Sequence, residues 1–286
     1  MKKLGVIANC DKPHAPEVLK RLGKKADELG LVLLADKPTA KLLKHCKLVP
    51  RSDIFTKSDV IVAMGGDGTM LRAVRELDGR NKPMMGVNIG GLGFMTSVAE
   101  DHLDRALECL ATDKYHESVS AIAESIVVSH GRKVARYRSL NDVVIRSGKS
   151  VRILSLDMTI NNKYVTSYAC DGLIVSTPTG STGHSLSAGG PILTPETPAF
   201  VISLICPHSL SSRPLVVPDG SEISIHITEC GGDVLLSIDG QVGMTLCQGD
   251  CVKVRRSGKS VRFIHLPGHS YFAVLRQKLH WRGSTL

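Results

Sequence analysis

The stretch that decides the fold is Asp59-Val60-Ile61-Val62-Ala63-Met64-Gly65-Gly66-Asp67-Gly68-Thr69. Its first half is apolar and rich in β-branched residues, which is typical of a buried parallel strand. The glycines that follow let the backbone turn sharply and leave room for a ligand to approach it. A helical pattern then begins at Thr69, with Thr69 or Asp67 available to cap the helix. Strand, turn and helix together predict a cradle of backbone amides for an anion, with the Asp67 carboxylate inside it.

Strands and helices alternate through the first part of the chain, and strands alone dominate the second. Short apolar runs alternate with amphipathic segments up to about Ala111, which indicates a parallel sheet covered on both faces. Strand-like runs separated by turn signals follow, and a last helical segment covers 271–279. We therefore predict an α/β plus all-β protein: an N-terminal Rossmann-like α/β domain, a C-terminal β-sandwich domain and a returning C-terminal helix. The expected boundaries are 1–115 and 116–267, with 268–286 packing back on the first domain.

Several shorter segments carry their own predictions. We expect helices at 16–29, 40–46 and 101–110, and turns at Asn161-Asn162, Gly231-Gly232, Asp239-Gly240 and Ser257-Gly258. Gly148-Lys149-Ser150 and Gly258-Lys259-Ser260 resemble the end of a phosphate-binding Walker loop, but the earlier glycine is missing in both. Both are therefore predicted to be turns between strands. No strand is followed by G-x-G-x-x-G, which argues against a dehydrogenase-type nucleotide site.

Composition limits the partners. The 286 residues are 42% hydrophobic and carry a net charge of +9, which fits a globular protein with anionic partners such as phosphorylated metabolites. Aromatic residues make up only 4%, without a nucleic-acid-binding signature. The chain shows no signal peptide and no apolar stretch of membrane-spanning length, so we expect a cytoplasmic protein with neither nucleic acid nor membrane as partner. The eight cysteines are dispersed, without a C-x-x-C pair, which predicts reduced thiols and no metal site made by the protein.

The glycine-bracketed carboxylate predicts phosphoryl transfer from a nucleoside triphosphate to a hydroxyl. The loop amides would hold phosphates, and Asp67 would accept the hydroxyl proton or position the hydroxyl for attack. A plain tight turn with a capping Asp is the alternative. Arg72, just inside the following helix, could bind phosphate, although a solvated helix face explains it nearly as well.

Two further stretches suit a nucleoside. Asn141-Asp142 interrupts an apolar segment; an amide suits the edge of adenine and a carboxylate suits ribose hydroxyls, although a hairpin turn explains the pair about as well. The stretch from Asp171 to Pro191 has small hydroxyl residues at nearly every step, so a flat polar ligand could lie against it. It lacks the G-x-S-x-G spacing of a hydrolase nucleophile. His184 could stack on a base or be an exposed loop residue.

These blocks, in this order, resemble the NAD kinase family over nearly the whole chain. The resemblance rests on 65–69, 88–94, 141–142 and 171–191, and is extended by 206–215, 239–241 and 275–281. The first block is shared with diacylglycerol and sphingosine kinases, whereas the 171–191 block is highly specific. The resemblance implies transfer of the terminal phosphoryl group of ATP, or in some members polyphosphate, to the 2′-hydroxyl of the adenosine ribose of NAD, giving NADP. It also implies a divalent metal, most often Mg²⁺, and a homodimer or homotetramer.

The resemblance assigns roles to individual residues. It implies that Asp67 is the proton acceptor and that Gly66, Gly68 and Arg72 line the phosphate region. The remaining residues are implied to bind NAD: Asn141, Asp142, Arg152, Asp171, Thr182, Gly183, His184, Ser185, Leu186, Ser187 and Gln241.

Three positions depart from the family pattern, and two other functions compete. Asp142 stands where Glu is usual, His184 where Tyr is usual, and Ala169 where many members have a basic or polar residue. We expect activity to survive with altered substrate affinity. A lipid kinase would share the first glycine block but needs an apolar acyl pocket, and a non-catalytic dinucleotide sensor would bind NAD without phosphoryl transfer.

Overall fold

The computed structural model describes residues 1–91, 93–148 and 153–281. The chain divides into two compact units: Met1–Val119 together with the segment from Val261 onward, and Ser120–Ser260. Two long strands, β6 (His116–Ser129) and β17 (Cys251–His265), contribute residues to both units. Each unit is described by itself.

The first unit is a parallel α/β unit, as predicted. Its strands follow the order β3-β2-β1-β4-β5, and the end of β17 pairs with β5 in parallel, with Arg262 opposite Pro83. The strands are β1 (Lys3–Ala8), β2 (Val32–Ala35), β3 (Lys47–Leu48), β4 (Val60–Gly65) and β5 (Pro83–Asn88). In such a sheet, ligands bind beyond the carboxyl ends of the strands, where the strand order reverses. Here that point lies between β1 and β4.

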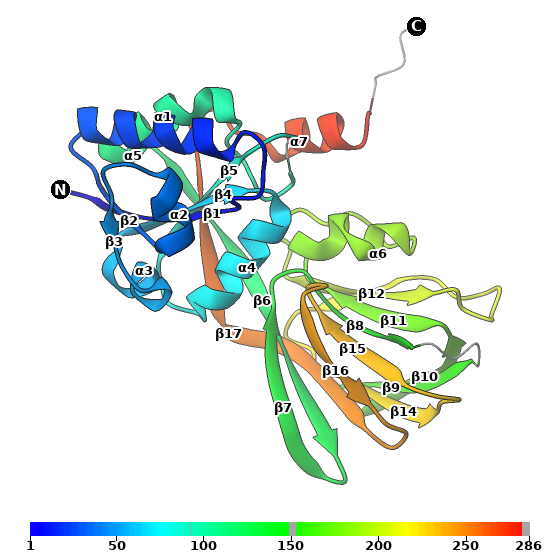
Figure 1. Ribbon diagram of the computed structural model, residues 1–286. Coiled ribbons are helices and arrows are strands. Elements are labelled where there is room, and N and C mark those ends of the chain that lie inside the picture. Colours follow the sequence, from blue (N-terminus) through cyan, green and yellow to red (C-terminus); the bar gives the residue numbers. More distant parts are fainter. Residues whose placement is uncertain (92, 149–152, 282–286) are drawn as a thin grey trace, which may run out of the picture. The chain divides into compact units, whose positions relative to one another are not determined.

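Helices cover both faces of this sheet (Figure 1). On one face, α1 (Ala15–Glu28) and α5 (Leu103–Ala111) pack against β1 and β4 in one apolar core. On the other lie α3 (Arg51–Lys57) and α4 (Asp67–Leu77). Gly5 lets α3 approach β1, because a Cβ there would overlap the side chains of Ser58 and Ile54. The prediction for 16–29 is confirmed within a residue, and 101–110 corresponds to α5 after a 3₁₀ turn at Glu100–His102.

The prediction of a helix at 40–46 was wrong in its position. The helix α2 runs over Lys37–Leu42, because the Asp36 side chain caps it by accepting the Thr39 N–H at 3.2 Å. No helix was predicted at α3. The last helix, α7 (Tyr271–Lys278), matches the predicted segment, and Ser270 caps its start by accepting the Ala273 N–H at its hydroxyl.

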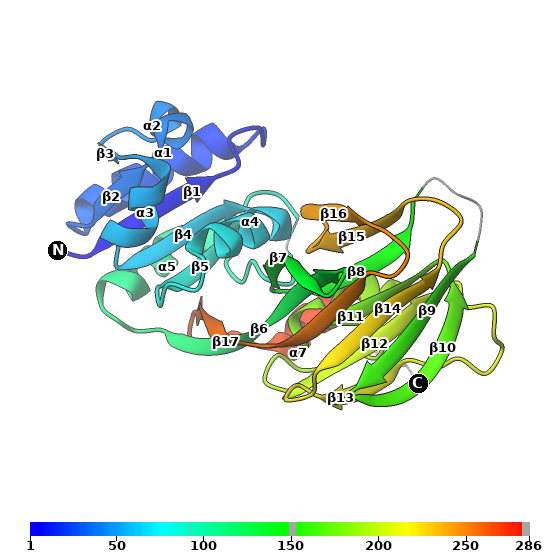
Figure 2. The same cartoon turned by 90° about the horizontal axis from the view of Figure 1, so that it is seen from below.

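The second unit contains two sheets that enclose one apolar core, which confirms the β-sandwich (Figures 1 and 2). The six-stranded antiparallel sheet has the order β13-β12-β11-β8-β15-β16, and the opposite sheet contains β10, β9, β14, β17, β6 and β7. The strands not yet given are β7 (Arg132–Ser139), β8 (Asp142–Ser147), β9 (Leu154–Ile160), β10 (Lys163–Cys170), β11 (Gly172–Ser176), β12 (Ala199–Ile205), β13 (Leu215–Pro218), β14 (Ile223–Glu229), β15 (Val234–Ile238) and β16 (Val242–Leu246). Of these, β10, β13 and β16 were not predicted.

The turn predicted at Ser257-Gly258 was wrong. Strand β17 runs through it without interruption, and Gly258-Lys259-Ser260 therefore lies inside a strand. Strand β17 pairs with β14 before this position, with β5 after it, and also with β6, and this pairing outweighs the local turn preference of Ser-Gly. Of the similar triplet at 148–150, only Gly148 lies within the described residues, and its N–H donates to the Asp233 carbonyl at 2.7 Å.

Within the described residues, no helix is long and apolar enough to cross a membrane. All eight cysteines, which lie in the described part of the chain, are free thiols.

Candidate functional site

In the first unit, Asp67 is held by backbone amides of a neighbouring turn. It is the first residue of α4, directly after β4. Its Oδ2 accepts the Phe94 N–H at 2.9 Å, and its Oδ1 accepts the Met95 N–H at 3.0 Å. The prediction that Asp67 or Thr69 caps α4 was wrong: Gly66 is the N-cap, without a side-chain cap bond. The Asp67 carboxylate faces the turn after β5 instead.

The absence of a side chain at Gly93 makes this arrangement possible. A Cβ there would overlap the Asp67 carboxylate and would lie 2.6 Å from Thr96 Oγ1. Gly66, in contrast, has open space where its Cβ would be, with no atom within 4 Å, and Gly68 is exposed. The turn between β4 and α4 thus presents backbone without side chains next to a fixed carboxylate, which suits the approach of phosphate oxygens.

The second glycine turn is supported from the end of the chain. Lys278, in α7, places its Nζ 5.9 Å from the centre of the Phe94 ring, within range of a cation–π contact. Phe94 is one of the two residues whose amides bind Asp67. The returning helix therefore supports the turn that positions the carboxylate.

In the second unit, one carboxylate fixes the backbone of the predicted nucleoside-binding pair. Asp239 accepts three consecutive N–H groups: Leu140 at 3.0 Å, Asn141 at 2.7 Å and Asp142 at 3.2 Å. Its own N–H donates to the Asp142 carbonyl at 3.1 Å. Charge-assisted bonds of this kind are stronger than neutral ones. The pair is not a hairpin turn, because β7 pairs with β6 whereas β8 pairs with β11 and β15.

The hydroxyl-rich block packs directly on Asn141. The Thr177 N–H donates to the Asn141 carbonyl at 2.8 Å, and a Cβ at Gly180 would overlap the same carbonyl. The backbone of residues 177–180 is therefore fitted to the backbone of residue 141. Two stretches nearly 40 residues apart, both predicted from sequence to contact a nucleoside, are brought together.

Burial and a neighbouring charge change the ionisation of Asp142. Its side chain is buried, and burial together with the negative charge of Asp239 raises its pKa to about 7. Burial is the larger cause, because removing a carboxylate from water disfavours the charged form. At neutral pH the Asp142 carboxyl is thus present in both protonation states, so it can donate as well as accept a hydrogen bond.

A cavity of about 380 Å³ opens beside this pair. The amide oxygen of Asn141 is buried and has no hydrogen-bond partner, which is unusual for a buried polar atom in the absence of a ligand. The cavity is large enough for part of a dinucleotide. Its lining comes from β8 and the residue before it, the short helix α6 (His184–Ser187), β15 and the β15–β16 turn: Asn141, Asp142, Val144, Arg146, His184, Ser237, Asp239 and Gly240.

The other predicted residues of the 182–187 segment divide between two environments. Ser185 is buried and its hydroxyl shares a hydrogen bond of 3.0 Å with that of Ser203, so it packs inward. Thr182 donates to the Thr179 carbonyl at 3.3 Å and is half-buried. The exposed residues are Gly183, His184 and Ser187, and Leu186 is half-buried.

Asp171 and Gln241 are not among the residues that line this cavity. Asp171 precedes β11, at the opposite end of this strand from Ser176, which pairs with Asp142. Its backbone bonds to Ile205 and Ser147 and not to the Asn141 cluster. Gln241 is exposed in the β15–β16 turn, next to the cavity. Arg152 lies outside the described residues. Ala169 is exposed on β10.

No role was predicted for Asp239 or Gly93. Asp239-Gly240 was predicted as a turn and as part of the family resemblance, and Asp239 does adopt the left-handed conformation, with φ +52°. Nothing in the spacing indicated that its carboxylate reaches residues 140–142. Gly93 was quoted as part of a glycine-dense turn, but its overlap with Asp67 depends on tertiary packing.

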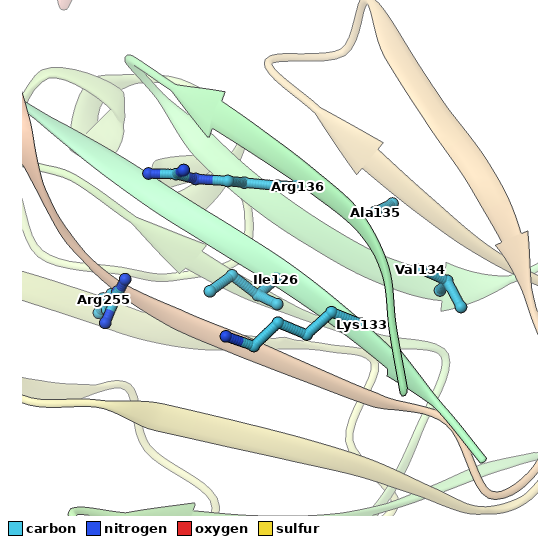
Figure 3. Close-up of a pocket in the computed structure, with 6 residues that line it drawn as sticks. All are labelled: Ile126, Lys133, Val134, Ala135, Arg136 and Arg255. Carbon is cyan, nitrogen blue, oxygen red and sulfur yellow. The ribbon is translucent and has the colours of Figure 1, made fainter. Parts of the chain in front are cut away.

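A second cavity, of about 330 Å³, lies on the β6–β7 hairpin and β17, and two of the residues that line it, Arg136 and Arg255, have a structural role (Figure 3). Arg136 and Arg255 both bind the buried Glu124 carboxylate; the Arg255 Nη2 distance is 2.8 Å. Burial opposes ionisation of Glu124, but the bonds from Arg255 and Arg136 outweigh it and lower its pKa. This ion-pair network joins β6, β7 and β17.

A divalent metal fits the first unit only together with a ligand. Among the described residues, no three His, Cys, Asp or Glu side chains are grouped to hold a metal ion. Asp67 offers two carboxylate oxygens, and each already accepts one amide N–H but retains further lone pairs. This donor set suits Mg²⁺, which commonly uses one or two carboxylates, waters and substrate phosphates.

A carboxylate among bare amides at the edge of a doubly wound sheet, and a nucleoside-sized polar cavity in a β-sandwich, define a nucleotide-dependent phosphotransferase. Family models agree: ATP-NAD kinase N-terminal domain matches residues 4–115, and ATP-NAD kinase C-terminal domain matches residues 140–266. The chain belongs to the ATP-NAD kinase family.

Individual relatives of the chain are also NAD kinases. The chain is 39% identical over 282 residues to the NAD kinase of Syntrophotalea carbinolica, covering 98% of this chain and 99% of the relative. It is 40% identical over 281 residues to the NAD kinase of Geobacter metallireducens, with the same coverage. The fold is similar to that of yeast NADH kinase, solved with NADH: the TM-score is 0.90 at 23% identity, over 100% of this chain and 89% of that one.

Proposed function

We propose that this protein transfers the terminal phosphoryl group of ATP to the 2′-hydroxyl of the adenosine ribose of NAD, giving NADP. Its substrates are NAD and ATP, in keeping with its family. The single observation that carries the catalytic assignment is the Asp67 carboxylate, fixed by two backbone amides beside open glycine backbone.

Asp67 acts as general base in this proposal. Its two amide bonds fix the orientation of the carboxylate and leave lone pairs free to accept the proton of the ribose hydroxyl. The oxygen then attacks the terminal phosphorus of ATP, the bond to the leaving ADP breaks, and the proton stays on Asp67. A positioned base contributes roughly 10²–10⁴ in rate.

The phosphate chain lies along the bare glycine backbone in this proposal. Gly66 and Gly68 have no side chain to exclude it, and Arg72, exposed on α4 about a turn and a half from Asp67, offers a cation. Mg²⁺, held mainly by phosphate oxygens and water, would screen the charge of the triphosphate when bound. Every other contribution comes from the chain itself.

The cavity of the second unit binds a nucleoside portion of NAD. The unpartnered Asn141 amide oxygen can accept a hydrogen bond from the adenine amino group. The Asp142 carboxyl can form a hydrogen bond with a ribose hydroxyl whether it is protonated or ionised. His184 lines the cavity and supplies a ring that can stack on a base. Asp171, Arg152 and Gln241 remain proposed contacts to other parts of NAD.

Location and assembly are part of the proposal. We place the protein in the cytoplasm as a homodimer or homotetramer. In the described part of the chain, β10 ends one sheet, and β13 and β16 end the other, so these strands have free edges that could pair with another copy.

One assay separates the candidate functions. Purified protein is incubated with labelled ATP, Mg²⁺ and either NAD, NADH or diacylglycerol, and the phosphorylated product is identified. We expect NADP from NAD and no labelled lipid. Labelled lipid without NADP would establish the lipid kinase, and NAD binding without any labelled product would establish the sensor. Replacing ATP by polyphosphate determines the range of donors.

A further inference from the structure

The loop after β1 lies against both glycine turns of the first unit. The Asn9 N–H donates to the Met64 carbonyl at 2.9 Å, and a Cβ at Gly65 would lie 3.2 Å from the Asn9 Cβ. The loop then curves back, with the Asp11 N–H donating to Asn9 Oδ1 at 3.2 Å. Because β1 and β4 are neighbours in the parallel sheet, their carboxyl ends lie at the same edge of the sheet. The loop after β1 therefore borders this edge together with the two glycine turns and Asp67.

Lys12 directs its ammonium group from this loop towards the second glycine turn. Its Nζ lies 4.0 Å from the position that a Cβ at Gly90 would take. Gly90 has φ +100°, and a Cβ at Gly91 would meet no atom within 4 Å. The ammonium thus lies beside bare backbone with open space next to it.

Lys12 is half-buried, and its ammonium group is unpaired in the described structure. Across the described residues, no hydrogen bond or ion pair involves Lys12 Nζ, whereas Lys2, Lys25 and Lys57 each bind a carboxylate. A partly buried cation without a partner is unfavourable unless an anion joins it. The protein provides that anion nowhere in the described structure, which points to a ligand.

A second cation faces the same loop. Arg72, on α4, is close enough for its positive charge to act on the Cys10 thiol, where it counteracts the rise in pKa caused by burial. Cys10 lies two residues before Lys12. Lys12 and Arg72 therefore belong to two elements that both border the β1–β4 edge, where the strand order reverses.

We propose that Lys12 binds the phosphate chain of the donor nucleotide, as a second cation beside Arg72. This inference rests on the proposed function and adds a residue that the glycine motif does not contain. A lysine ammonium is a compact charge with three donors, so it can contact non-bridging oxygens of two neighbouring phosphates. Gly90 and Gly91 leave the space between the ammonium and the turn free for these oxygens. Lys12 does not contact the nucleoside cavity of the second unit in this proposal.

The test is a comparison of Lys12→Gln, Lys12→Arg and Lys20→Gln, with Lys20 as a control because it is exposed on α1. For Lys12→Gln we expect the KM for ATP to rise at least tenfold while the KM for NAD stays within twofold. Lys12→Arg should recover most of the loss, and Lys20→Gln should behave like the wild type. An unchanged KM for ATP in Lys12→Gln, or an equal rise for both substrates, would overturn the inference.

A binding measurement separates failure of this inference from failure of the proposed function. The increase in Tm caused by Mg-ATP, and separately by tripolyphosphate, is measured without NAD for wild type and Lys12→Gln. We expect both shifts in the wild type and a clear reduction of both in the variant. If the wild type forms NADP but the variant keeps its full shifts, only the inference fails. If the wild type forms no NADP, the shifts alone decide whether Lys12 binds polyphosphate chains.

Discussion

The Asp67 carboxylate occupies the space that a side chain at Gly93 would need. A Cβ there would overlap both Oδ1 and Cγ of Asp67. The next two residues, Phe94 and Met95, donate their amides to the same carboxylate. The turn after β5 and the first residue of α4 are therefore fitted to each other, and the position of the acid depends on a glycine 26 residues away in sequence.

Gly93→Ala should therefore lower kcat. The added methyl group must displace the carboxylate or the turn, and a misplacement of about 1 Å can cost 10²-fold in rate. We expect kcat to fall at least tenfold with a smaller change in either KM. Gly220→Ala serves as control, because a Cβ there meets no atom within 4 Å. Equal kcat values for the two variants would show that the fit between residues 67 and 93 does not matter.

Asp239→Asn should weaken NAD binding. An amide cannot accept the three N–H groups at 2.7–3.2 Å as strongly as the carboxylate does, so residues 140–142 lose part of their support. We expect the KM for NAD to rise roughly tenfold with little change in the KM for ATP, and the free energy of unfolding to fall by about 1–3 kcal/mol. Glu229→Gln, at an exposed strand end, is the matched control. A normal KM for NAD in Asp239→Asn would remove Asp239 from the site.

Asp142 should make the free energy of unfolding depend on pH. Burial and the Asp239 charge raise its pKa from 3.8 to about 7, so between these values the folded state binds the proton more tightly than the unfolded state does. The contribution of Asp142 protonation to the free energy of unfolding is complete below pH 3.8 and is lost as the pH rises through about 7.

Wild type and Asp142→Asn should be compared by thermal unfolding at pH 5 and pH 8. We expect the Tm of the wild type relative to the variant to be lower at pH 8 than at pH 5. A difference between the two proteins that does not change with pH would contradict the raised pKa. The KM for NAD, measured over the same range, shows whether the cavity prefers one protonation state.

Glu124→Gln should destabilise the second unit at neutral pH. The variant leaves Arg136 and Arg255 without their shared carboxylate, and because both arginines are about half exposed we expect a loss of about 1–3 kcal/mol. The Glu124 pKa is lowered, so this contribution exists above pH 4.5 and is lost as the pH falls below it. Urea unfolding at pH 7 and pH 3.5 measures it. Equal losses at both pH values would exclude the ionic explanation.

Sequence patterns predicted the parts of the fold that are determined locally. The apolar strand before Gly65, the amphipathic helix at 16–29 and the change to strands after residue 111 all depend on periodicity within a few residues. The predictions were wrong where the secondary structure of a segment depends on pairing with strands that are distant in sequence. The turn predicted at Ser257-Gly258 is part of a strand because β17 pairs with β14, β5 and β6. The edge strand β13 has only four residues, mostly exposed, and β16 was missed although its residues alternate in burial.

The site residues also divide into those visible in a local sequence pattern and those that depend on residues distant in sequence. Asp67 and Asn141-Asp142 were predicted because a carboxylate among glycines and polar residues within an apolar run are visible in sequence. Asp239 and Lys12 were given no role, because only folding brings their neighbours near: Asp239 accepts the Leu140 N–H, and the Lys12 Nζ lies beside Gly90.

The most direct test of the account is the turnover of Asp67→Asn, measured as NADP formed from NAD and Mg-ATP at saturating concentrations of both. Asparagine keeps the size of the side chain and can still accept one of the two amides at Oδ1, so the variant should fold and bind both substrates. The account predicts that kcat falls by roughly 10²–10⁴ while both KM values change little. A variant that folds and turns over at nearly the wild-type rate would show that Asp67 is not the base.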